Sequence, residues 1–316
     1  MVQIRLIYAT DLHGSDLMFK KLVSAALLYK ANVVVVGGDI TGKGIVPIVQ
    51  KRTGEYEASV YGTRYTAKSR EELDKILKLI SNYGFYPYIT SEHELEAFSD
   101  QQAFEKLYYQ LSTKRLREWI EYARDKLKEA NVEFYMMPGN DDPYEVDEVL
   151  KDDFVVNHAR KALEIADGRY VLIGYDRTNV TPWKCPRDVD EELIEKELEE
   201  ICSRVRMGRP VILNTHCPPY GTLLDLAPKL DKDLKPVISG GSVIMEHVGC
   251  VSVRRIIEKY QPLLGLHGHI HESRAVDNLR KTIIVNPGSA YNEGVLFMAL
   301  VVLENGKVKS TLLLKG

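Results

Sequence analysis

The chain has 316 residues, of which 45% are hydrophobic, as expected for a globular protein in water. Its 42 basic and 45 acidic residues give a formal net charge of −3, which argues against tight, non-specific binding to nucleic acid. No apolar run approaches the roughly 20 residues that a membrane span needs, and the amino terminus lacks the pattern of a signal peptide. We therefore expect a cytoplasmic location and no membrane contact.

An alternation of strand and helix opens the chain. Residues 4–9 form an apolar run typical of a strand, and Gly14-Ser15 precedes a helix with an apolar stripe at helical spacing. Four consecutive valines at 33–36 indicate a strand that is buried on both faces, as in a parallel sheet. Further short apolar runs follow at 132–137, 211–213 and 263–266. The sequence therefore predicts an α/β fold with a mostly parallel sheet.

Residues 43–115 interrupt this alternation, and we interpret them as a helical cap inserted over the site. The first part, residues 43–70, has little periodicity, and its six basic residues stand against two acidic ones. Amphipathic helical patterns follow, and the last of these helices is expected to return the chain to the sheet at Val132. Residues 1–316 are nevertheless expected to form a single domain, because candidate ligands lie near both ends of the chain.

The second half of the chain changes period. Residues 154–165 and 169–175 read as antiparallel strands, and helical spacing favours helices over 190–205 and 253–260. The segment 217–252 is rich in Gly and Pro, which indicates loops, and Asn305-Gly306 is typical of a hairpin turn. The four cysteines form no C-x-x-C pair, so we expect reduced thiols rather than a thiolate zinc site.

Five short polar blocks stand where predicted strands end. They are Asp11-Leu12-His13, Gly38-Asp39, Gly139-Asn140-Asp141-Asp142, Thr215-His216 and Gly268-His269-Ile270-His271. Parallel sheets bind ligands beyond the carboxyl ends of their strands. Carboxylate, carboxamide and neutral imidazole groups together suit transition metals better than calcium. The sequence therefore predicts a centre for two divalent ions about 3.5–4 Å apart, the spacing of two-metal hydrolases.

The order and spacing of these blocks, which span residues 11–271, resemble those of the calcineurin-like metallophosphoesterases. Asn286-Pro287-Gly288-Ser289 is also similar to a segment that some members carry after the last histidine block. The resemblance implies a four-layer fold, in which two packed mixed β-sheets are flanked by helices. It implies two ligand sets that share a bridging Asp39: one of Asp11, His13, Asp39 and His271, and one of Asp39, Asn140, His216 and His269. Manganese is the expected metal, with iron, zinc or nickel as alternatives.

The ligand set and the resemblance predict a metal-dependent phosphoesterase that acts on a phosphodiester or a phosphomonoester. The attacking group would be a metal-bridging hydroxide. Many family members carry a histidine after the asparagine to protonate the leaving group, whereas this chain carries Asp141, and an ordinary aspartate is a poor acid at neutral pH. Asp141 is still the candidate catalytic residue at this position, with structural support of the site as the alternative role. Because an aspartate is a poor acid here, its identity favours diesters over monoesters.

Two other functions stay open at this point. A nuclease would use the basic, tyrosine-bearing stretch 43–70 to meet DNA or RNA. A non-catalytic scaffold would keep the metal pocket without turnover, an idea supported only by the missing histidine at position 141. The apolar stripes of the inserted helices also leave a homodimer open.

Overall fold

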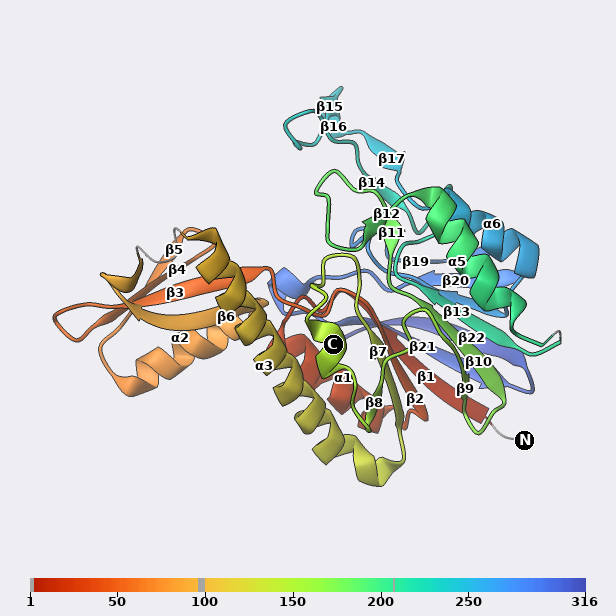
Figure 1. The fold of residues 1–316 in the computed structure, drawn as a ribbon, viewed down its shortest axis with the longest axis horizontal. Coiled ribbons are helices and arrows are strands. Elements are labelled where there is room, and N and C mark those ends of the chain that lie inside the picture. The colour runs from red at the N-terminus through yellow and green to blue at the C-terminus, as the bar shows by residue number, and fades with distance from the viewer. Residues whose placement is uncertain (1–2, 96–99, 207) are drawn as a thin grey trace.

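The computed structural model describes residues 3–95, 100–206 and 208–316 and contains two six-stranded sheets (Figure 1). The strands of the first sheet are β1 (Gln3–Ala9), β2 (Val33–Gly37), β7 (Glu133–Met137), β8 (Val155–Val156), β21 (Phe297–Glu304) and β22 (Lys307–Lys315). They lie in the order β22-β21-β1-β2-β7-β8. The four strands from β1 to β8 are parallel, whereas β21 and β22 run antiparallel at one side.

The second sheet has the same mixed character. Its strands are β9 (Ala162–Ile165), β10 (Tyr170–Tyr175), β13 (Val211–Thr215), β18 (Leu264–Leu266), β19 (Ala275–Leu279) and β20 (Thr282–Asn286). In the order β19-β20-β18-β13-β10-β9, the four inner strands are parallel and the two outer ones antiparallel. The predicted mixed α/β character is therefore confirmed.

The two sheets pack face to face, and helices cover their outer faces. One apolar cluster joins the sheets, and it includes Leu6 and Leu172. The outer face of the first sheet packs on α1 (Asp16–Leu28) and α3 (Gln101–Leu127), where Phe19 and Trp119 stack with ring centroids 4.4 Å apart. The outer face of the second packs on α5 (Glu191–Ser203) and α6 (Val251–Tyr260). The four valines of β2 are fully buried because alternate side chains enter the two clusters beside this sheet.

The inserted segment is not the helical cap that the sequence predicts. Residues 44–91 form a four-stranded sheet with one helix: β3 (Gly44–Gln50), β4 (Tyr56–Val60), β5 (Thr63–Ala67), α2 (Arg70–Asn82) and β6 (Phe85–Ser91). Alternate residues such as Val46 and Ile48 pack with α2, which is a strand pattern within a stretch that shows little periodicity in the sequence. Tyr61-Gly62, with φ of 49° and 78°, forms the two-residue turn between β4 and β5.

The helix that follows is one continuous element. α3 runs through residue 115 without a break, and its carboxyl-terminal half packs against α1 in the core. Figure 1 shows the β3–β6 sheet projecting from the two-sheet core, with α3 extending from one to the other. Residues 96–99 of the predicted cap lie outside the described residues. The insertion is therefore a small α/β unit connected to the core by a long shared helix.

The remaining elements are short. They are the helices η2 (Lys128–Ala130), α4 (Val146–Val149) and η3 (Tyr291–Glu293), and the strands β11 (Thr178–Asn179), β12 (Asp188–Val189), β14 (Leu226–Pro228), β15 (Ile238–Ser239), β16 (Ser242–Val243) and β17 (Met245–His247). The helices α5 and α6 and the hairpin at Asn305-Gly306 confirm the sequence predictions. The strand predicted over 154–165 is confirmed only in part: β9 pairs antiparallel with β10, whereas Val155–Val156 joins the first sheet as β8. The segment 217–252 consists mostly of loops but also carries the β14–β17 and β15–β16 ladders. None of the described helices has the length and apolar character needed to cross a bilayer.

Candidate metal centre

The structure brings the five predicted blocks together beyond the carboxyl ends of β1, β2, β7, β13 and β18. Within this cluster, potential ligand atoms lie within 4.8 Å of one another in three groups: Asp11, His13 and His271; Asp39, His216 and His269; and His13, Asp39 and Asp141. Because His13 and Asp39 each belong to two groups, the two predicted ligand sets adjoin. Asn140 lines the same cavity as Asp39, His269 and His271.

The first ligand set converges on one point. His13 Nε2 lies 3.1 Å from His271 Nε2, and His271 Nε2 lies 3.3 Å from Asp11 Oδ1. His13 Nε2 is also 3.7 Å from Asp39 Oδ2. Two ring nitrogens this close share either a proton or a cation between them. This geometry fits residues that hold a metal ion.

The second set contains two buried polar atoms that form no hydrogen bond within the described residues. His216 Nδ1 donates to the carbonyl of Gly37 at 2.9 Å, which leaves Nε2 directed toward Asp39 Oδ1 at 3.3 Å. Asn140 Nδ2 donates to Asp188 at 2.9 Å, which leaves Oδ1 as an acceptor. Within the described residues, neither His216 Nε2 nor Asn140 Oδ1 forms a hydrogen bond. Such buried atoms are rare unless they have another ligand, and a divalent cation would satisfy both.

The charges of the cluster also fit cations. Burial alone would lower the pKa of His216, but the carboxylates of Asp39 and Asp11 raise it to about 10. Burial alone would raise the pKa of Asp11, but His271 holds it well below its usual range. Burial lowers the pKa of His269 to about 4, which favours the neutral imidazole that metals bind. The buried carboxylates of the cluster are stabilised in their ionised form only by nearby positive charge. Protonated imidazoles supply this charge when no metal ion is bound.

The backbone is strained where it presents the ligands. Asp11, His13, Asp39 and His269 have φ values of 53°, 41°, 49° and 66°, in the left-handed region that residues with a Cβ rarely adopt. Such strain costs about 1–2 kcal/mol per residue and concentrates at functional sites. Gly139 allows this close packing, because a Cβ there would lie 2.3 Å from Asp39 Oδ1.

Residues behind the ligands fix these loops. Asp142 accepts hydrogen bonds from the backbone amides of Ile40, Thr41 and Gly139 at 2.7–3.0 Å, so it holds two ligand loops together rather than facing a metal.

The segment 286–289 also holds ligand loops in place through hydrogen bonds to their backbone. Asn286 Nδ2 donates to the Ile270 carbonyl at 2.9 Å, and Ser289 Oγ donates to the Asp11 carbonyl at 2.7 Å. The similarity of this segment to a family pattern therefore has a structural explanation.

Two residues near the ligands were not singled out by the sequence analysis. Lys43 Nζ lies 2.5 Å from Asp141 Oδ2, and both side chains are about one-third exposed. Burial alone would lower the pKa of Lys43, but Asp39 and Asp141 raise it above its usual range. The Tyr291 ring lies 4.5 Å from that of His13. The sequence analysis treats Lys43 only as part of a basic stretch. Its position four residues after Asp39 could have indicated that it belongs to the site.

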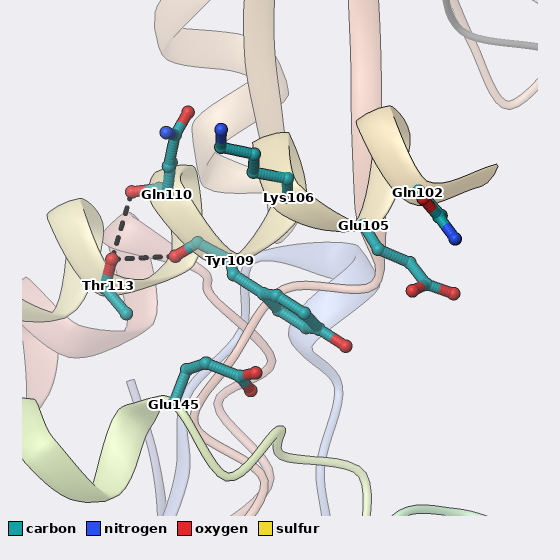
Figure 2. Close-up of a pocket in the computed structure, with 7 residues that line it drawn as sticks. All are labelled: Gln102, Glu105, Lys106, Tyr109, Gln110, Thr113 and Glu145. Carbon is teal, nitrogen blue, oxygen red and sulfur yellow. Dashed lines mark hydrogen bonds between the residues drawn. The ribbon is translucent and has the colours of Figure 1, made fainter. Parts of the chain in front are cut away.

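A large cavity opens over this cluster. Its volume is about 980 Å³, and its walls include Asp39, Lys43, Asn140, residues 179–183 and parts of the segment 227–248. A second hollow of about 380 Å³ lies on α3 beside Glu145 (Figure 2). Figure 2 shows Tyr109 projecting into it, and Thr113 Oγ1 donating within the helix to the Tyr109 carbonyl at 2.7 Å. Because this hollow contains none of the predicted ligands, the large cavity is the candidate active site.

Comparisons with known proteins give a relative in sequence and several solved structures of similar fold. No family model matches the chain. The uncharacterised protein MJ1162 of Methanocaldococcus jannaschii is 36% identical over 167 residues, which make up 52% of this chain and 68% of that protein. Among solved structures, TT1561 of Thermus thermophilus is similar with a TM-score of 0.54 and 14% identity over 99% of both chains. An archaeal phosphodiesterase gives a weaker similarity, with a TM-score of 0.36 and 10% identity over 98% of this chain and 100% of its own.

The relationship to MJ1162 is close enough to indicate a shared family, whereas the likeness to TT1561 concerns the fold alone. The resemblance to the calcineurin-like metallophosphoesterases rests on the sequence blocks and on their convergence at the strand ends of two packed sheets. The chain therefore belongs to the same family as MJ1162, and its five polar blocks resemble those of the calcineurin-like metallophosphoesterases.

Proposed function

We propose that the protein is a metal-dependent phosphoesterase that hydrolyses phosphodiesters in preference to phosphomonoesters. The observation that carries this proposal is the convergence of seven potential ligands beneath one cavity, with Asp39 within reach of both ligand sets. Asp39 Oδ2 faces His13, and Asp39 Oδ1 faces His216. A carboxylate in this position suits a bridge between two ions.

The proposed metal is manganese, bound at two adjoining sites. Asp11, His13, Asp39 and His271 would hold one ion, and Asp39, Asn140, His216 and His269 the other. Bound cations would supply the positive charge that polarises a phosphoryl group and activates water. The protein itself contributes the loops, whose strained backbone and buried hydrogen bonds orient the ligands.

The preference for diesters follows from charge at the cavity. The Asp141 carboxylate lines the cavity 3.9 Å from His13 Nδ1, close to where a phosphoryl group would bind. A monoester dianion would be repelled by this carboxylate more strongly than a diester monoanion. The ion pair with Lys43 requires the ionised carboxylate and does not favour the acid role that the sequence suggested for Asp141. We assign to Lys43 the more direct interaction with the substrate, as a fixed positive charge.

The test compares bis-p-nitrophenyl phosphate with p-nitrophenyl phosphate on metal-stripped protein to which manganese is added. We expect manganese-dependent turnover with a higher kcat/KM for the diester. Asp39→Ala should abolish it, whereas Asp74→Ala, which changes an exposed aspartate of α2, should leave it unchanged. The absence of metal-dependent hydrolysis of either ester in protein that binds two ions would refute the proposal and favour the non-catalytic scaffold.

A nuclease is the second candidate, but the structure weakens its basis. Most basic side chains of residues 43–70 pair with acidic groups: Lys43, Lys51, Arg64, Lys68 and Arg70. The stretch therefore presents a largely compensated surface to a polyanion. Salt-sensitive binding of single- or double-stranded DNA or RNA at low ionic strength would support the nuclease hypothesis again.

We also propose a cytoplasmic location. Its support is that the four cysteines are free thiols, which suit a reducing compartment. A homodimer remains a prediction, and light scattering of the purified protein would test it.

A further inference from the structure

We infer, on the basis of the proposed function, that the substrate carries a single phosphoryl group joined to an uncharged apolar or aromatic group that packs against Trp183. The cavity of about 980 Å³ extends well past the ligand residues. This volume lies at the upper end of the range for small-molecule sites, which is about 300–1,000 Å³. A phosphoryl group alone would leave most of it unfilled.

The wall beyond the ligands carries several large apolar side chains, and two separate loops contribute them. The loop 179–185 contributes Trp183, which is 62% exposed, and Val180, which is 57% exposed. The segment after β14 contributes Leu230 and Leu234. Large apolar side chains grouped around a concave surface mark a binding site more often than scattered ones do. The indole of Trp183 offers a flat face on which a ring can stack.

The charges of this wall exclude a second phosphate. Among the described residues that line it, Lys232 stands against Asp231 and Glu272, whereas Glu246 is paired with Lys229 at 3.5 Å. The other lysine of the cavity, Lys43, lies at the ligand cluster beside Asp141, where we assign it to the phosphoryl group that reacts. A substrate with several phosphates would meet more negative than positive charge beyond the ligands. Polynucleotides and nucleoside polyphosphates therefore fit this cavity less well than a monoanionic ester with an apolar group.

Tryptophan fluorescence offers a direct measure of this contact. The chain has two tryptophans, and the other, Trp119, is buried and stacked on Phe19. A ligand that covers Trp183 will therefore change the emission of one exposed indole. We expect diphenyl phosphate to give a saturating change with manganese-loaded protein. Dimethyl phosphate should bind at least about tenfold more weakly, the effect expected for losing one aromatic stack.

Variants separate the contact from a general structural effect. Trp183→Ala should weaken diphenyl phosphate about tenfold by calorimetry and leave dimethyl phosphate unchanged. Trp183→Phe should retain the calorimetric affinity and lose the emission change. Leu223→Ala, which removes an exposed apolar side chain outside the cavity lining, is the matched control and should change neither.

Three results would overturn the inference: equal binding of the two phosphate esters, equal weakening of both by Trp183→Ala, or tighter binding of inorganic pyrophosphate than of diphenyl phosphate. The proposed function fails by a different result. If the wild-type protein shows no metal-dependent turnover of bis-p-nitrophenyl phosphate, the phosphoesterase proposal is refuted. If it shows turnover but binds diphenyl phosphate no better than dimethyl phosphate, only the role of Trp183 is refuted.

Discussion

Replacing Arg187 with methionine should destabilise the protein strongly, although this residue contacts no predicted ligand side chain. Arg187 is fully buried, and its guanidinium bonds Asp176 at 2.8 Å and Asp147 at 3.0 Å. Nε also donates to the Asp142 carbonyl at 3.0 Å, on the turn that carries Asn140. Arg187 thus joins three negatively polarised groups beneath the site.

The expected loss follows from what the substitution leaves behind. Methionine fills much of the volume but leaves the buried Asp176 carboxylate with one cation, Arg160, whose Nε lies 3.2 Å away. Breaking a buried ion pair on one side costs about 3–5 kcal/mol, so we expect a loss of about 3 kcal/mol in the free energy of unfolding. Arg160→Met is the matched control. Its guanidinium pairs with the same aspartate but is 38% exposed, so its loss should stay below about 1 kcal/mol.

Urea unfolding of the two variants, followed by circular dichroism, measures both losses. A manganese titration adds a second readout, because Arg187→Met frees the turn of Asn140 and should weaken metal binding, whereas Arg160→Met should not. Equal losses of stability in the two variants would show that burial of Arg187 does not control the energy of this network.

Three further predictions follow from the backbone, a buried histidine and the metal. Gly84→Ala should lower the free energy of unfolding by clearly more than Gly54→Ala. Both glycines have a positive φ, but a Cβ at Gly84 would lie 2.2 Å from the carbonyl oxygen of His13, whereas no atom lies within 4 Å of a Cβ at Gly54. Urea unfolding measures the difference, and similar losses would contradict the contact. Burial lowers the pKa of His158 to about 4, so its contribution to stability is present above pH 6.5 and is lost as the pH falls toward 4. Between pH 7 and 4.5, wild type should therefore lose about 2 kcal/mol more than His158→Gln, and parallel pH profiles would contradict this. Manganese should raise the Tm of metal-stripped wild type with concentration and raise that of Asp39→Ala much less; equal shifts by calorimetry would place the ions elsewhere.

The sequence predicts the core of this protein better than its insertion. The apolar runs of the core are almost uniformly hydrophobic, as in the four valines of β2, and such runs leave few alternatives to buried parallel strands. The sequence also predicts the ligand blocks, because each block stands at the end of such a strand. The strands β3–β5 are only partly buried, so polar residues such as Thr63 and Arg64 interrupt their pattern. Their stability depends on packing against α2, which a local pattern does not reveal.

The sequence could not predict the contacts between distant segments either, because these contacts also depend on tertiary packing. Lys43 approaches Asp141 across 98 residues of chain, and the distance depends on how β2 and β7 lie side by side. Trp183 reaches the cavity from a loop without regular structure. Residue type and spacing identify ligands that share a motif, but they do not place an isolated lysine or tryptophan in a cavity.

The left-handed conformations of Asp11, His13, Asp39 and His269 have a consequence for how this protein evolves. Glycine adopts such conformations without steric cost, so a glycine at any one of them would relieve about 1–2 kcal/mol of strain, partly offset by the greater entropy of the unfolded chain. Selection for thermal resistance alone would therefore tend to erode the centre, starting with the residues that define it. These four side chains therefore carry a conformational cost that glycine would avoid at the same positions.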